Sequence, residues 1–128
     1  MRLAAILAAF RASAAMLAAS AFLAAATAVP AAPPTTCGGS DDYARALCAY
    51  QKRNFADAEA GFKAIAERAE DPKAIPATYF LARTEMKQGR YDEASTLFIR
   101  IYETAPPFYR EWNCDFLLGE CRKALGKG

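Results

Sequence analysis

The sequence predicts an all-α protein made of stacked helical hairpins, and a repeated pattern is the main reason. The pattern aromatic-x-x-Ala-x-x-x-aromatic begins at Phe55 and again at Tyr91, an offset of 36 residues. A third, shorter copy aligns Gly126 with Gly89 at an offset of 37 residues. A repeat of this length is one helical hairpin, which buries its apolar face only by stacking on its neighbours. No stretch beyond residue 28 alternates apolar and polar residues long enough to indicate a strand.

Two hairpins and a C-terminal capping helix are expected to make up residues 40–128. The helices are predicted at residues 41–53, 57–70, 75–88, 92–104 and 111–125. Ser40 resembles an N-cap for the first helix and is followed by acidic residues, which suit the positive end of a helix. The second helix repeats apolar residues at helical spacing and ends at Asp71-Pro72.

Proline and glycine bound the remaining helices. Pro76 is tolerated in the first turn of the third helix, and Gly89 supplies its C-terminal turn. The fourth helix repeats apolar residues along one face and stops before Pro106-Pro107. The fifth helix has no partner helix after it, so we expect it to cap the second hairpin, as terminal repeats commonly do.

Residues 1–28 differ from the rest of the chain and predict a signal peptide. They are rich in Ala, and Ala26-Thr27-Ala28 offers the small-x-small geometry of a cleavage site. The alternative is an anchor retained in the inner membrane, because the uncharged apolar run of 18 residues approaches the ~20 needed to span a bilayer. Residues 29–39, rich in Pro and Gly, are expected to form a linker. The expected location of the protein is the periplasm.

The charge balance gives no sign of a nucleic-acid partner. The chain has 16 basic and 14 acidic residues, and removal of the segment that carries Arg2 and Arg11 leaves 14 of each. Nucleic-acid-binding proteins usually carry clustered Lys and Arg, which this balance does not suggest. Contact with a membrane is expected only through an uncleaved N-terminal segment.

The sequence also lacks the residues and spacings that usually indicate catalysis or metal binding. The chain has no histidine, which is the commonest general base. No two cysteines have C-x2–4-C spacing, and Gly38-Gly39 lacks the strand and the lysine of a phosphate-binding loop. We therefore expect no enzyme activity, no metal and no cofactor.

The repeated pattern resembles the tetratricopeptide repeat. Ala58-x3-Phe62 and Ala94-x3-Phe98 resemble the second helix of that unit, whose pattern is W-x2-L-G-x2-Y, then A-x3-F, then P. Leu118-Gly119 supplies its Leu-Gly pair, although Trp and Tyr are replaced there, and the periods of 36 and 37 exceed the family's 34. The resemblance implies a divergent member with a right-handed α-α superhelix, whose concave groove binds a protein or a peptide.

Superposing the repeats places Tyr43, Tyr79 and Phe116 at one equivalent position, which the resemblance assigns to the groove. Residues one and two turns further extend this predicted site. The candidate groove residues are Tyr43, Leu47, Tyr50, Tyr79, Arg83, Met86, Lys87, Phe116, Glu120 and Lys123. Such a trough would hold an extended peptide or a partner helix through aromatic and Met contacts, with Arg83 pairing with a carboxylate.

Two alternatives to this site stay open. The three equivalent rings could instead pack between neighbouring helices or be covered by the linker. The protein could also be a small structural subunit of a larger cell-envelope assembly, docking through its incomplete third repeat. Trp112 belongs to an aromatic connector that we expect to pin the last helix.

Four cysteines in an exported chain favour a disulfide, with three connectivities. If Cys114 and Cys121 lie on one helix, their Cα atoms are about 10 Å apart, beyond the reach of a bridge. Cys37 lies in a Gly-rich segment that could fold back along the first helix, so Cys37–Cys48 is the favoured pair. The alternative is free, buried cysteine, which behaves as a small hydrophobe.

Overall fold

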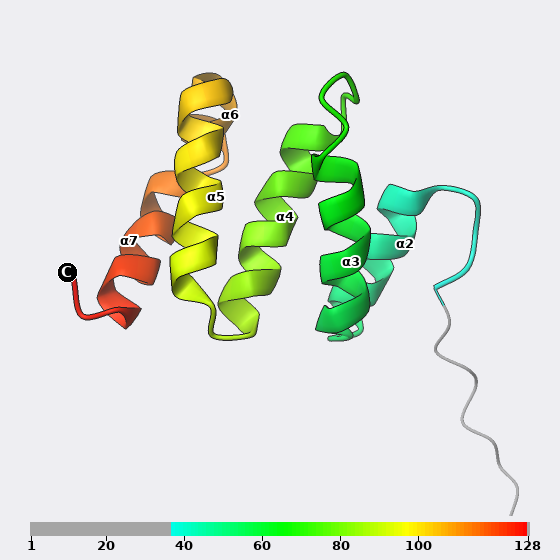
Figure 1. Cartoon of the computed structure of the whole chain (residues 1–128), viewed down its shortest axis with the longest axis horizontal. Helices are drawn as coiled ribbons and strands as arrows, with labels where there is room; N and C mark the ends of the chain where they lie inside the picture. The colour runs from blue at the N-terminus through cyan, green and yellow to red at the C-terminus, as the bar shows by residue number, and fades with distance from the viewer. Residues whose placement is uncertain (1–36, 128) are drawn as a thin grey trace, which may run out of the picture. The chain divides into compact units, whose positions relative to one another are not determined.

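The computed structural model describes residues 37–127, and every regular element in this range is a helix (Figure 1). In chain order the helices are α2 (Asp42–Gln51), α3 (Phe55–Ala66), α4 (Ala74–Lys87), α5 (Tyr91–Thr104), α6 (Pro106–Glu111) and α7 (Cys114–Ala124). The all-α prediction is confirmed for this range. The predicted signal peptide, residues 1–28, and most of the predicted linker lie outside the described residues. None of the six helices combines the length and the hydropathy of a membrane span.

Side-chain caps determine where the first two helices begin. The Asp41 carboxylate accepts hydrogen bonds from the backbone N–H groups of Tyr43 and Ala44, at 3.0 and 3.3 Å. The prediction that Ser40 caps this helix is wrong, because the Asp41 carboxylate satisfies the first amides and carries the charge that a helix N-terminus favours. Asn54 caps α3 by accepting a 3.5 Å bond from the Asp57 N–H, so α3 begins two residues earlier than expected.

The turn after the first helix of each repeat adopts the left-handed conformation. Gly89 follows α4 with φ 80°, and Gly126 follows α7 with φ 74°. The equivalent residue after α2 is Arg53, with φ 63°. Glycine adopts this conformation without strain, whereas a residue with a Cβ atom does so at a cost in free energy.

The C-terminal part has two helices where one was expected. The prediction of a single helix over residues 111–125 is corrected by α6 and α7, which are separated by Asn113 at φ 52°. The proline pair that stops α5 also occupies the first turn of α6, where proline needs no N–H partner and its fixed φ suits a helix. The third repeat therefore begins with an additional short helix that the first two repeats lack.

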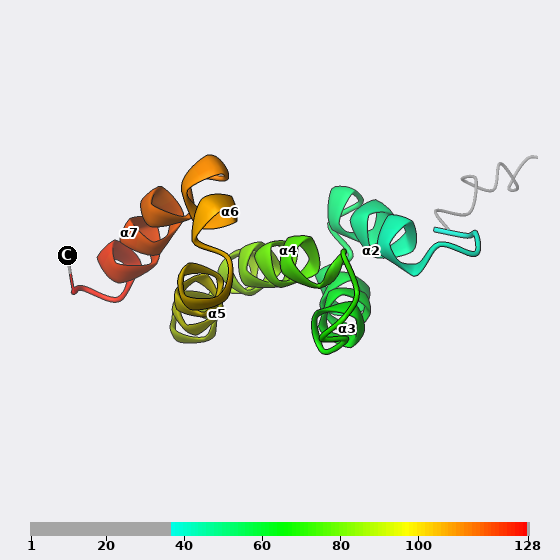
Figure 2. The same cartoon turned by 90° about the horizontal axis from the view of Figure 1, so that it is seen from above.

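The core is built from repeat-equivalent residues on successive helices. Each helix packs on the next along a row: α2 on α3, α3 on α4, α4 on α5 and α5 on α7. The following pairs are fully buried: Ala58 and Ala94, Phe62 and Phe98, and Ile65 and Ile101. Seen from above, α2 and α6 lie on one side of α4, and α3 and α5 lie on the other (Figure 2).

Two contacts fix how closely neighbouring helices approach. A Cβ atom on Gly61 of α3 would lie 2.9 Å from the Cβ atom of Ala46 on α2, so glycine lets these helices pack closely. Arg90, the N-cap of α5, donates to the Glu85 carboxylate on α4 and, at 2.5 Å, to the Glu59 carboxylate on α3. One guanidinium thus links three consecutive helices.

Candidate functional site

Half-exposed aromatic rings on α2 and α4, and on or just after α6, lie over a base of buried rings from α3, α4 and α5. The buried base consists of Phe62, Tyr79 and Phe98. The rings above it are Tyr43 and Tyr50 of α2, Phe80 of α4, and Phe108 and Trp112 at α6. We refer to these five rings, together with Arg83, as the aromatic face.

Phe80 is the centre of the half of the aromatic face that lies between α2 and α4. Its ring stacks on Phe62, with a centroid distance of 5.4 Å. The edges of Tyr43 and Tyr50 approach it at 6.4 and 5.7 Å. Stacked and edge-to-face geometries are the favourable arrangements for aromatic pairs, so each ring is held in place by its neighbours.

Trp112 carries the aromatic face across to α6. Its ring stacks on Phe108 at 4.8 Å and approaches Tyr79 and Phe80 edge-on at 5.0 and 6.4 Å. The indole remains 39% exposed. Trp112 was expected to pin the last helix, but its ring contacts hold α6 against α4.

Arg83 supplies the charge of the aromatic face. Its guanidinium carbon lies 5.9 Å from the Tyr50 ring centroid and 5.8 Å from that of Tyr79, within the range of cation–π attraction. Its Nη1 donates to the Tyr79 hydroxyl at 3.4 Å. Across residues 37–127 the ion pairs do not involve Arg83, so its charge is available to a carboxylate from outside.

The predicted groove residues do not form one ladder of rings. Tyr79 is 6% exposed, which corrects its assignment as a groove-lining contact. Phe108 of the additional helix and Trp112, which follows that helix, cover it. Phe116 is 65% exposed, and no aromatic ring within the described range pairs with it. The other eight divide into two groups. Half-buried positions are held by Tyr43, Leu47, Tyr50, Arg83 and Met86, and exposed positions by Lys87, Glu120 and Lys123.

Sequence reasoning missed Phe80 and Phe108 as members of the site. Phe80 directly follows the residue that was chosen by superposition, but neighbouring helical positions face different directions, so only one of the two was assigned to the groove. Phe108 could have been found from Pro106-Pro107, because a proline pair in a first turn also starts a helix.

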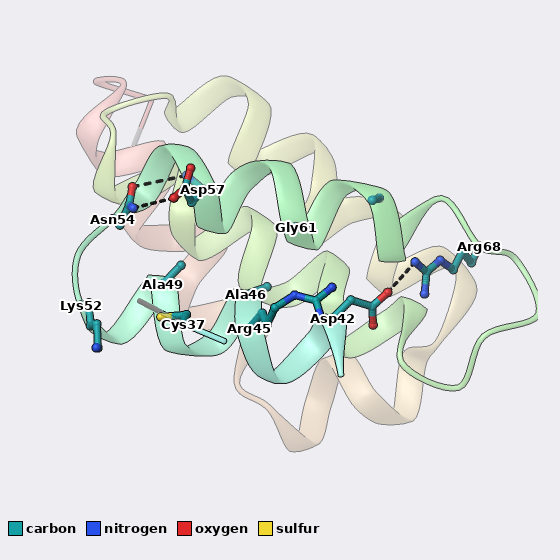
Figure 3. Close-up of a pocket in the computed structure, with 11 residues that line it drawn as sticks. Cys37, Asp42, Arg45, Ala46, Ala49, Lys52, Asn54, Asp57, Gly61 and Arg68 are labelled. Atoms are coloured by element: carbon teal, nitrogen blue, oxygen red, sulfur yellow. Dashed lines mark hydrogen bonds and ion pairs between the residues drawn. The ribbon is translucent and has the colours of Figure 1, made fainter. Parts of the chain in front are cut away.

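A separate pocket lies between α2 and α3 (Figure 3). Its volume is about 650 Å³, and its floor consists of small residues: Ala46, Ala49, Gly61 and Ala64. An ion pair between Asp42 and Arg68, at 2.5 Å, closes one end, and Lys52 lies at the other (Figure 3). We call this space the α2–α3 pocket. None of the predicted groove residues lines it.

Cys37, at the edge of this pocket, is bonded to Cys48 of α2, with an S–S distance of 2.00 Å. This is the pair that the sequence favoured. Cys114 and Cys121 are free and fully buried on α7. Burial raises the pKa of Cys114 to about 11, and it also raises the pKa of Cys121, so both remain neutral thiols at physiological pH.

Nothing in residues 37–127 is arranged for metal chemistry. No three or more Cys, Asp or Glu side chains in this range are grouped so that they could hold a metal ion. The side chains of the aromatic face are suited instead to contact with apolar and carboxylate groups.

Comparison with known families agrees with the repeat architecture. The family model described as Tetratricopeptide repeat matches residues 49–112, half of the chain, from the end of α2 through α6. Comparisons with curated proteins and with solved structures give no match. Repeats of this kind generally serve as non-catalytic scaffolds for protein–protein contacts. The chain belongs to the tetratricopeptide repeat family.

Proposed function

We propose that this protein is an exported scaffold that binds a peptide, or an extended segment of a partner protein, on its aromatic face. The observation that supports this proposal is the two-layer arrangement of rings. Phe62 and Tyr79 are buried beneath, while Tyr50, Phe80 and Trp112 keep part of their surface exposed above. Aromatic residues and arginine are the side chains that most often dominate binding energy at protein interfaces.

The rigidity of this surface favours binding of a flexible partner. Each exposed ring is held against a second ring, so it loses little conformational entropy when a partner docks. The side chain of Arg83 lies over Tyr50 and Tyr79 and is suited to bind a carboxylate of the partner. The proposed ligand is therefore a peptide with apolar side chains and at least one acidic group.

Export and location are part of the same proposal. The Ala-rich N-terminal segment with its small-x-small motif supports secretion to the periplasm, with an uncleaved inner-membrane anchor as the alternative. The right-handed superhelix expected of this family would place α2, α4 and α6 along a concave surface.

The experiment compares two double variants in a pull-down from cell-envelope extract. Tyr50→Ala with Arg83→Ala removes a ring and the cation of the aromatic face. Tyr102→Ala with Arg100→Ala removes the same residue types from exposed positions on α5 and is the matched control. We expect partner recovery to fall at least about tenfold for the first variant and to stay unchanged for the control, because loss of a hot-spot residue typically costs about 2 kcal/mol. Equal recovery with both variants would refute the proposal.

A further inference from the structure

The α2–α3 pocket is the repeat equivalent of a second, smaller pocket. Four residues that line the α2–α3 pocket recur at an offset of 36 among the residues that line the second one: Arg45 and Leu81, Ala49 and Glu85, Asp57 and Glu93, and Gly61 and Leu97. The second pocket measures about 270 Å³, and the rest of its lining is Thr96 together with Glu59 and Lys63 of α3. Thus α3 packs at the second pocket, whereas no helix within residues 37–127 packs at the equivalent side of the first.

This comparison indicates that the α2–α3 pocket is shaped for a helix. In the second pocket Leu97 and Glu85 fill the floor, whereas the equivalent residues of the first are Gly61 and Ala49. A helix that enters the α2–α3 pocket must therefore bring a large side chain of its own to fill the larger volume. Voids that are left empty lose the contacts their lining would otherwise make.

The charge at the pocket edge specifies a second property of this helix. The Asp42 carboxylate is paired with Arg68 at 2.5 Å, and the Asp57 carboxylate accepts a 2.7 Å bond from the Asn54 amide. Lys52, in contrast, makes no ion pair within residues 37–127. A carboxylate on the incoming helix would complement it.

Helix α7 presents both groups. Phe116 is 65% exposed, more than the other exposed large apolar side chains of the described range. Glu120 lies one turn further along the same helix and is exposed. The two are four residues apart, which is also the spacing between Glu59 and Lys63, the two residues that α3 places at the second pocket. α2 and α7 lie at opposite ends of the row of helices, so α7 does not reach the pocket of its own chain (Figure 1).

We propose that α7 of one copy docks in the α2–α3 pocket of a second copy, with Phe116 over the Ala and Gly floor and Glu120 facing Lys52. The contact is heterologous, because it joins two different surfaces. Each added copy leaves one unused pocket and one unused α7, so the assembly grows head to tail beyond a dimer, as an open chain or, where the rotation between copies closes, as a ring. This self-association is independent of ligand binding on the aromatic face.

The first test uses the purified full chain and two variants that each disable one surface. Phe116→Ser removes the apolar side chain, and Ala64→Trp fills the pocket from an exposed position on α3. By light scattering, the wild type should grow in mass with concentration, and each variant alone should stay monomeric. An equimolar mixture of the two should form dimers and nothing larger, because only one productive pairing remains.

Several results would overturn the proposal. The proposal is wrong if the wild type stays monomeric at every concentration. It is equally wrong if the wild type is monomeric because the chain's own residues before Cys37 cover the pocket. Variants that associate as well as the wild type would also overturn it. Tyr102→Ser, which removes another exposed aromatic residue, is the control and should leave association unchanged. The aromatic-face variant Tyr50→Ala with Arg83→Ala should also assemble normally, which separates this proposal from the proposed function.

A charge exchange gives a second test that preserves the fold. Lys52→Glu and Glu120→Lys both change exposed residues, and each should weaken association, by up to about fivefold for one lost ion pair. The double variant should recover association, because the two opposite charges face each other again. Failure of the double variant to recover, with normal helical circular dichroism in all three proteins, would rule out the proposed orientation of α7.

Discussion

Individual residues at repeat-equivalent positions show where this chain departs from an ideal repeat. The turn that ends the first helix of each hairpin needs a positive φ, and glycine provides it at Gly89 and Gly126. Arg53 adopts the same conformation in the first repeat with φ 63°. The hairpin therefore carries a local backbone strain that two of the three repeats avoid.

Replacing Arg53 by glycine should stabilise the protein. Relief of the left-handed strain is expected to raise the free energy of unfolding by about 1 kcal/mol, measured by urea denaturation. The reciprocal change, Gly89→Arg, should lower it by a similar amount. Arg53→Ala is the control for loss of the side chain and should leave stability nearly unchanged. A stabilising effect of the alanine variant equal to that of glycine would show that strain is not the cause.

The pKa of the Cys114 thiol predicts how stability depends on pH. Burial raises this pKa from 9.0 to about 11. As pH rises above 9.0, the unfolded chain loses the Cys114 proton while the folded protein keeps it, so the unfolded state is favoured. The contribution of this thiol to the free energy of unfolding is fully present below pH 9.0. By about pH 11 this contribution has fallen by on the order of 2 kcal/mol. The free energy of unfolding, measured by urea denaturation, should decline less steeply over this pH range for Cys114→Ala than for the wild type. An identical decline in both proteins would contradict this effect of the Cys114 thiol.

At the scale of elements, caps and turns decide the boundaries that periodicity leaves open. Apolar spacing predicted the helices that correspond to α3 and α5, and cap and turn residues predicted those that correspond to α2 and α4. Apolar spacing did not predict α6, because a six-residue helix is too short to show a period. The consequence for function is large, since Phe108 and Trp112 at this helix cover Tyr79 and complete the aromatic face.

The disulfide between Cys37 and Cys48 should stabilise the first hairpin. The bond closes a loop with a sequence separation of 11, for which loop-closure entropy gives about 2–3 kcal/mol. Cys37→Ser with Cys48→Ser should lower the free energy of unfolding by this amount, and reduction of the wild type should have the same effect. In the double variant, a reducing agent should cause no further change. Equal stability of the oxidised and reduced wild type would contradict this contribution.

At the scale of the whole molecule, sequence predicted the architecture better than the site. The Ala and Phe residues at equivalent positions of the repeats are buried in the core, because each repeat packs against its neighbours in the same way. The aromatic ladder failed because superposition assumes that repeats stack without insertions. With α6 inserted, Tyr79 is buried and Phe116 lies outside the aromatic face. The α2–α3 pocket could not be predicted, since it results from small residues on two separate helices.

The hairpins should unfold as one unit. Phe80 stacks on Phe62 of the first hairpin and also contacts Trp112, so the rings connect the two ends. Phe62→Ala should lower stability by about 3–5 kcal/mol. Circular dichroism and the fluorescence of Trp112, the only tryptophan, should show the same shifted midpoint. Tyr102→Ala, at a 59% exposed position, is the control and should change the unfolding midpoint only slightly. Separate midpoints for the two signals would show independent hairpins.

The distribution of the cysteines has a consequence for how the chain would mature in the oxidising compartment to which we propose it is exported. Cys37 and Cys48 are near neighbours in sequence, whereas Cys114 and Cys121 are far from them and are buried only after α7 docks on α5. Under the proposed export, a newly translocated chain would expose two thiols that can attack the correct bond until the last helix is in place. Chains with impaired docking of α7 would accumulate as isomers with non-native disulfides and as disulfide-linked adducts between chains. Burial of the two thiols on the C-terminal helix thus protects the Cys37–Cys48 disulfide from exchange.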